Sequence, residues 1–148
     1  MPMYWHFSML LISNPNKEFE NYFLERITNI NTSLQETKGY IAGIFNGFLR
    51  INNNDLSKDS ITLKYIEAKK LHSFVGFQNL GDWIFLIRTT FPESLNASEE
   101  YYDSVAKCSY YKCYVILDRK WRCFEEMADR LEYFIETITL PSSGRKTV

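Results

Sequence analysis

Two charged residues stand inside an otherwise apolar run, and they are the first candidates for chemistry. The run is LGDWIFLIRTTFPESLN at residues 80–96, with Asp82 and Arg88 inside it. A carboxylate and a guanidinium can orient a polar ligand in a pocket that has aromatic walls. Together with the acid and the tyrosines that follow, the candidate ligand-binding residues are Asp82, Arg88, Glu93, Tyr102 and Tyr110.

The same residue types also have structural explanations. Asp82 follows Gly81, so it can cap a new helix that begins at Trp83, a contribution of about 1 kcal/mol. If the run is buried all round, Arg88 must form an ion pair, which is often structural. Its nearest acidic candidates in sequence are Asp103, Glu93 and Asp82.

The familiar catalytic and metal-binding motifs are absent from the sequence. It contains no GxGxxG, GxxxxGK[ST], GxSxG or HExxH motif. Helical di-iron sites place a Glu three residues before a His, whereas the residue three before His72 is Lys69. Cys108, Cys113 and Cys123 are odd in number and form no CxxC pair. We therefore expect free thiols, no metal and no cofactor, and the sequence leaves open whether the protein is an enzyme.

Charge and hydropathy exclude two classes of partner. Lys and Arg number 17 against 18 Asp and Glu, and a chain without a basic excess is a poor nucleic-acid binder. The sequence contains no run of about 18 apolar residues, the length that a membrane-spanning helix needs. The opening MPMYWHFSMLLIS, residues 1–13, has no basic start, so we interpret it as part of the fold and expect a cytoplasmic protein.

Apolar residues recur at steps of three and four along most of the chain, which predicts amphipathic helices. The expected helices are 15–30, 34–51, 61–76, 83–91, 98–117 and 118–140. Ser98 is the expected cap of the fifth helix and Asp118 that of the last. The apolar face expected for the last helix consists of Trp121, Phe124, Ala128, Leu131, Ile135 and Ile138. Residues 52–60 are a polar turn, and residues 141–148 are a polar C-terminal tail. The predicted fold is all-α, a single-domain bundle of about five to six helices within residues 1–140.

Three glycines fall at four-residue intervals inside the second predicted helix. Gly39, Gly43 and Gly47 therefore share one face. Each costs a helix roughly 0.5–1 kcal/mol relative to Ala, which a close approach to another helix could offset. The first interpretation is close packing within the fold, and the alternatives are a homodimer seam and a ligand groove.

Part of the chain resembles a family of uncharacterised bacterial proteins. The shared pattern is LGD, a hydrophobic run, FPESL, a pair of tyrosines and a further tyrosine, over about residues 77–137. The matching residues are Leu80, Gly81, Asp82, Phe91, Pro92, Glu93, Ser94, Leu95, Tyr101, Tyr102 and Tyr110. The resemblance implies a helical protein without an assigned activity, in which these residues act as a unit.

The leading functional hypothesis is a non-catalytic helical module that binds another protein or a second copy of itself, the latter as a homodimer. Its high aromatic content suits an interface, because tyrosine combines apolar area with a polar hydroxyl. The alternative is a small-molecule site, with or without catalysis, between the predicted helices 83–91 and 98–117.

Overall fold

The computed structural model describes residues 17–46 and 57–139, and within these ranges every regular element is a helix and there is no strand. The all-α prediction is confirmed. The seven α-helices are α2 (Lys17–Thr28), α3 (Gln35–Asn46), α4 (Lys58–Leu71), α5 (Phe74–Thr90), α6 (Glu99–Ile116), α7 (Arg122–Asp129) and α8 (Leu131–Ile138). A short 3-10 turn, η2 (Pro92–Ser94), follows α5. The described helices thus exceed the predicted five to six.

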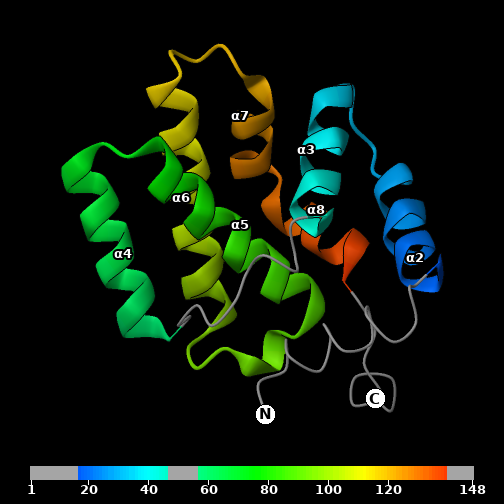
Figure 1. Cartoon of the computed structure of the whole chain (residues 1–148), viewed down its shortest axis with the longest axis horizontal. Helices are drawn as coiled ribbons and strands as arrows, with labels where there is room; N and C mark the ends of the chain where they lie inside the picture. The colour runs from blue at the N-terminus through cyan, green and yellow to red at the C-terminus, as the bar shows by residue number, and fades with distance from the viewer. Residues whose placement is uncertain (1–16, 47–56, 140–148) are drawn as a thin grey trace.

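Helix α5 runs through the middle of the structure (Figure 1). Four successive residues, Ile84 to Ile87, are buried, so this part of the helix is covered on all sides. Its most extensive contacts are with α6, and α4, α8 and α3 also contact it. A helix that is apolar all round belongs in a core. The neighbouring helices therefore take their positions from α5.

The boundary between α4 and α5 differs from the prediction that a helix ends near Gly76. Helix α4 ends at Leu71, and His72 adopts a left-handed conformation with φ 49°. Ser73 then caps α5, because its hydroxyl oxygen accepts a hydrogen bond from the Gly76 N–H at 2.9 Å. Glycine is the usual residue at such a helix end, and here a histidine occupies the position. For this reason the sequence pattern misplaced the boundary by several residues.

The predicted helix start at Asp82 is wrong, because α5 continues without a break from Phe74 to Thr90. Gly81 lies in its interior for a different reason. A Cβ built on Gly81 would come within 2.8 Å of Cζ of Tyr110, whose ring is fully buried. Glycine therefore lets the Tyr110 ring of α6 lie directly against the backbone of α5.

The predicted single helix 118–140 is two helices. Arg130, with φ −118° and ψ 25°, separates α7 from α8. Its guanidinium donates to the Asn31 carbonyl at 2.7 Å and to Glu126 at 2.9 Å. The bend lets α7 pack on α6 and α3 while α8 packs on α2 and α5, which one straight rod could not do.

The ends of this C-terminal region also correct the prediction. Asp118 does not cap the helix, because it lies in the preceding turn with a left-handed φ of 59°. Trp121, expected on the apolar face, is more than half exposed. The other residues of the predicted apolar face are buried, namely Phe124, Ala128, Leu131, Ile135 and Ile138. The start of α6 agrees with the prediction, since Ser98 caps it by accepting from the Tyr101 N–H.

Among the described residues, no helix makes a close contact at the glycine face, and the homodimer seam and the ligand groove stay predictions. Gly39 and Gly43 are exposed, and a Cβ built on either meets no described atom within 4 Å. No helix of the described ranges approaches them because the buried side of α3 carries Thr37, Ile41, Ile44 and Phe45 instead. Gly47 lies outside the described residues.

Several expectations fall on parts of the chain that the structure does not describe. They concern the apolar opening at residues 1–13, the first part of the polar turn at 52–60, the end of the predicted helix 34–51 and the tail at 141–148. Of the helices that are described, none has the length and apolar character needed to cross a bilayer.

The two kinds of glycine predict opposite effects of the same substitution. Gly81→Ala should lower the free energy of unfolding by roughly 1–3 kcal/mol, because the new methyl group displaces the buried Tyr110 ring. Gly43→Ala should raise it by roughly 0.5–1 kcal/mol, because alanine favours the helix and nothing described obstructs it. Urea unfolding followed by circular dichroism measures both. Equal effects of the two changes would contradict the close contact at Gly81.

Candidate functional site

Three helices bring their polar side chains together at Asp82. The hydroxyl of Tyr40 on α3 donates to Oδ1 of Asp82 at 2.6 Å. The hydroxyl of Tyr110 on α6 donates to the same oxygen at 2.7 Å. Gln78, one turn before Asp82 on α5, lies near Tyr40 and acts to lower the pKa of its hydroxyl. We call Tyr40, Gln78, Asp82 and Tyr110 the Asp82 cluster.

An aromatic ring from a fourth helix closes this cluster. Phe124 of α7 lies edge-on to Tyr40 at a centroid distance of 5.1 Å and stacks on Tyr110 at 6.5 Å. It also meets Phe74, at the start of α5, edge-to-face at 5.6 Å. Such ring pairs add to the apolar burial of each side chain. The carboxylate therefore sits beside a wall of rings with little water around it.

This environment changes the acidity of Asp82. Burial raises its pKa from 3.8 to about 6, although the hydrogen bonds from Tyr40 and Tyr110 act in the opposite direction. Loss of hydration destabilises the charged form more than two phenols restore it. Asp82 therefore exchanges its proton close to neutral pH.

The groups that face Asp82 keep their protons. Burial raises the pKa of both tyrosines, and the negative charge of Asp82 raises them further. The Cys113 thiol on α6 has its pKa raised to about 12 by burial and then by Asp82. A thiol needs its deprotonated form to act as a nucleophile. The arrangement offers one proton acceptor, Asp82, and no activated nucleophile among these neighbours.

Arg88 forms a separate ion pair two turns further along α5. Its Nε donates to Oδ1 of Asp103 at 2.7 Å, and its Nη2 donates to Oδ2 at 3.0 Å. Both side chains are largely buried, with 12% and 10% of their areas exposed. The more exposed Glu99 approaches Nη1 at 3.5 Å. Of the three acidic partners that the sequence suggests, Asp103 is the one that binds Arg88 in a bidentate pair.

The two polar contacts lie at different levels of the α5–α6 pair. Asp82 meets Tyr110 and Arg88 meets Asp103, so the two helices run antiparallel (Figure 1). Six residues separate Asp82 from Arg88, a rise of about 9 Å along α5. The structure thus brings Asp82 and Tyr110 together and places Arg88 apart from them, against its own partner.

The remaining two candidates lie elsewhere. The Tyr102 ring is buried, and its hydroxyl donates to Oδ1 of Asn96 at 3.0 Å. Glu93 is exposed on the 3-10 turn η2. The five candidates therefore do not converge on one point. Tyr40, which the sequence reasoning missed, contacts Asp82 from 42 residues away, and no local pattern signals a contact at that separation.

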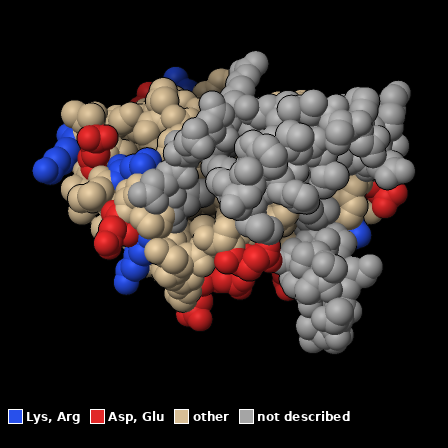
Figure 2. Space-filling view, turned by 60° about the horizontal axis from the view of Figure 1, so that its bottom comes forward, with Lys and Arg blue, Asp and Glu red and all other residues tan. Residues whose placement is uncertain are grey.

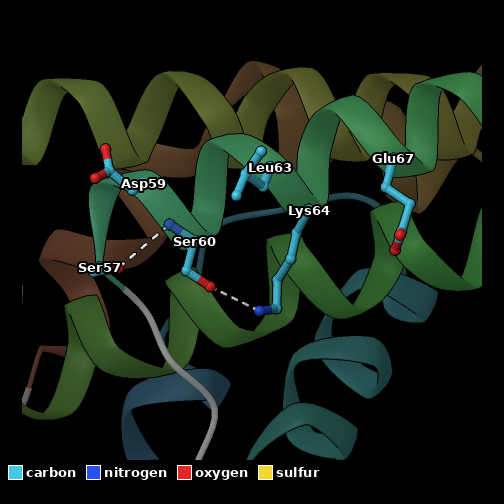
Figure 3. Close-up of a pocket in the computed structure, with 6 residues that line it drawn as sticks. All are labelled: Ser57, Asp59, Ser60, Leu63, Lys64 and Glu67. Carbon is cyan, nitrogen blue, oxygen red and sulfur yellow. Dashed lines mark hydrogen bonds between the residues drawn. The ribbon is translucent and has the colours of Figure 1, made fainter.

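Two surface hollows lie along other helices. One, of about 540 Å³, follows the N-terminal half of α4 and is lined by Ser57, Asp59, Ser60, Leu63, Lys64 and Glu67 (Figure 3). The other, of about 260 Å³, follows α7 and is lined by Arg122, Glu125, Glu126, Asp129 and Arg130. None of the five candidate ligand residues lines either one.

The part of the chain in the structure also contains no group of three or more His, Cys, Asp or Glu side chains placed to hold a metal ion. Comparisons of the chain with protein-family models, with curated proteins and with solved structures give no match. The functional argument therefore rests on the geometry of the described residues.

The raised pKa of Asp82 predicts a pH-dependent stability. The native state holds the proton of Asp82 more tightly than the unfolded chain does. The free energy of unfolding should therefore fall as the pH rises from about 4 to 6, by a total of up to about 3 kcal/mol above pH 6. Asp82→Asn keeps an acceptor oxygen for the phenols and removes the charge. In urea titrations the variant should be more stable than wild type at pH 8, and about as stable as wild type at pH 4.

Tyr110→Phe serves as the companion variant. It removes one of the hydrogen bonds that lower the pKa of Asp82, so the midpoint of the pH effect should move upward. If Asp82→Asn changed the free energy of unfolding equally at pH 4 and pH 8, or was more destabilising at pH 8, the native state would not favour the protonated form of Asp82.

The buried ion pair predicts a large effect from one truncation. Arg88→Ala leaves the buried Asp103 without its bidentate partner and should lower the free energy of unfolding by roughly 3 kcal/mol or more. The matched control is Arg122→Ala in the exposed pair with Glu125, where we expect a change within about 0.5 kcal/mol. Similar losses in both variants, measured by chemical denaturation, would contradict a structural role specific to Arg88.

Proposed function

We propose that this all-helical chain is a single bundle domain that works by binding another protein surface, without catalysis. The observation that carries this proposal is a set of large apolar side chains left exposed on one side of α4 and just beyond it. Leu63, Leu71 and Val75 have 66%, 70% and 60% of their areas exposed, and Ile66 has 44%. We call the exposed side of α4, with Asp59, Leu63, Ile66, Lys70 and Leu71, the α4 face.

Several large apolar side chains exposed close together in the sequence can mark a protein interface. In contrast, the inner side of α4 packs against α5 and α6. Ile61 and Ala68 are buried, and Tyr65 packs edge-on against Phe77 of α5 at 5.5 Å. The Thr62 hydroxyl bonds that of Tyr101 on α6. Helix α4 is thus held from one side and presents its other side outward.

The internal partners of the polar residues favour binding over a small-molecule pocket. Asp82 is bound by two phenols and Arg88 by a bidentate carboxylate, so neither is set up to orient a ligand in the gap between α5 and α6. Close packing of the Tyr110 ring on Gly81 fills part of that gap. A pocket between these two helices is therefore the weaker candidate.

Two further proposals accompany this one. The free thiols of Cys108, Cys113 and Cys123 support a reducing compartment, and we propose the cytoplasm. We also propose membership of the uncharacterised bacterial family. Its support is that Tyr110 contacts both Gly81 and Asp82, and all three residues belong to the shared pattern.

Site-specific photo-crosslinking in the host cell tests the binding role. A photoreactive p-benzoylphenylalanine at Leu63 or at Leu71 should give a covalent adduct of defined mass with a protein chain. The control position is Leu24 on α2, a leucine of similar exposure outside the α4 face, where we expect no such adduct. Crosslinks that stay within the same chain, or no adduct at either α4 position, would overturn the proposal.

A further inference from the structure

The α4 face has an ordered distribution of charge as well as apolar surface. Asp59 stands one turn before Leu63, and Lys70 stands one turn after Ile66. Asp59 and Leu63 project from successive turns of the helix, while Lys64 bends back to donate to the Ser60 hydroxyl at 2.8 Å (Figure 3). Along this face Asp59 lies near the N-terminal end, Leu63 and Ile66 lie in the middle and Lys70 lies near the C-terminal end, with the exposed Glu67 beside Leu63.

Both terminal charges are available to a partner. Asp59 and Lys70 are exposed, and within residues 17–46 and 57–139 neither forms an ion pair. Lys69 adds a second base at the same end. Acidic and basic side chains both appear on the left of the molecule in Figure 2, the side where Figure 1 places α4. A surface of mixed sign does not suit a polyanion, which needs a basic stripe.

Resting on the proposed binding role, we propose that the partner of the α4 face is a second copy of this chain, docked antiparallel through α4. Asp59 and Lys70 lie at equal distances from a point midway between Leu63 and Ile66. A two-fold axis through that point places Asp59 of each copy against Lys70 of the other. The same axis places Leu63 of each copy against Ile66 of the other. Such a self-complementary patch is what a two-fold interface requires.

The dimensions agree with this pairing. Eleven residues separate Asp59 from Lys70, so the two ion pairs lie about 16 Å apart, at either end of the apolar contact. The antiparallel arrangement also sets the two helix dipoles in opposite directions. Leu71, the last residue of α4, and Val75, near the start of α5, are further exposed apolar side chains beside this face. One helix face buries less than the roughly 800 Å² per partner of a standard interface, so the dimer is weak and reversible.

Charge reversal with complementation tests the pairing. Asp59→Lys alone places lysine against Lys70 twice, and Lys70→Asp alone places aspartate against Asp59 twice. Each variant alone should self-associate about tenfold or more weakly than wild type in sedimentation equilibrium, since a factor of ten needs only about 1.4 kcal/mol. An equimolar mixture of the two variants restores both ion pairs, and its association should return to within about threefold of wild type.

The control is Glu100→Lys, which makes the same charge change at the second position of α6 instead of α4. It should associate as wild type does. Circular dichroism on each variant shows that the helices are intact, and the complementation in the mixture shows that each variant is still folded and competent.

Two outcomes would overturn the inference. One is a wild-type chain that stays monomeric at several hundred micromolar, and the other is a mixture that associates no better than its components. If crosslinks from Leu63 lead to a different protein, the binding role stands and the self-association fails. If those crosslinks lead to no other chain, both fail.

Discussion

Burial of the C-terminal half of α5 on every side is the constraint from which the rest of the structure follows. Its apolar run from Ile84 to Ile87 has no side suited to water, so other helices must surround it. The charged residues on the same helix are then enclosed as well, and each needs a partner on a covering helix. Tyr40 and Tyr110 donate hydrogen bonds to Asp82, and Asp103 forms an ion pair with Arg88. The polar contacts that first suggested chemistry are thus consequences of covering this helix.

The two largely enclosed acids, Asp82 and Asp103, differ in the partners that surround them. Asp103 receives a bidentate guanidinium, which compensates the charge directly. Asp82 receives only phenols, and burial keeps its pKa near 6. One carboxylate is therefore held in a structural ion pair, whereas the other is held by neutral phenols. Sequence position alone does not distinguish them, because both lie among apolar helical neighbours.

Local patterns predicted the helices, their apolar sides and the Ser98 cap, because these depend on residues three or four apart. They failed where tertiary contacts override them. Gly81 is typical of a helix end in the sequence, yet it lies inside α5, where the Tyr110 ring leaves no room for a Cβ atom. Arg130 breaks an apparently continuous amphipathic helix because it binds the distant Asn31 carbonyl. The glycines at 39 and 43 suggested close packing, but α3 buries another side. Tyr40 could not be assigned to the site, because it contacts Asp82 from 42 residues away in the sequence.

One contact between the first and last described helices bears on how the chain reaches this structure. The Tyr22 hydroxyl donates to the Thr139 carbonyl at 2.7 Å, across 117 positions of sequence. Helices α5, α6 and α7, in contrast, contact their immediate successors through short turns. Closing a long loop costs more entropy and slows the step that needs it. We expect the central helices to assemble first, with the meeting of α2 and α8 completing the folding reaction as its late, high-contact-order event.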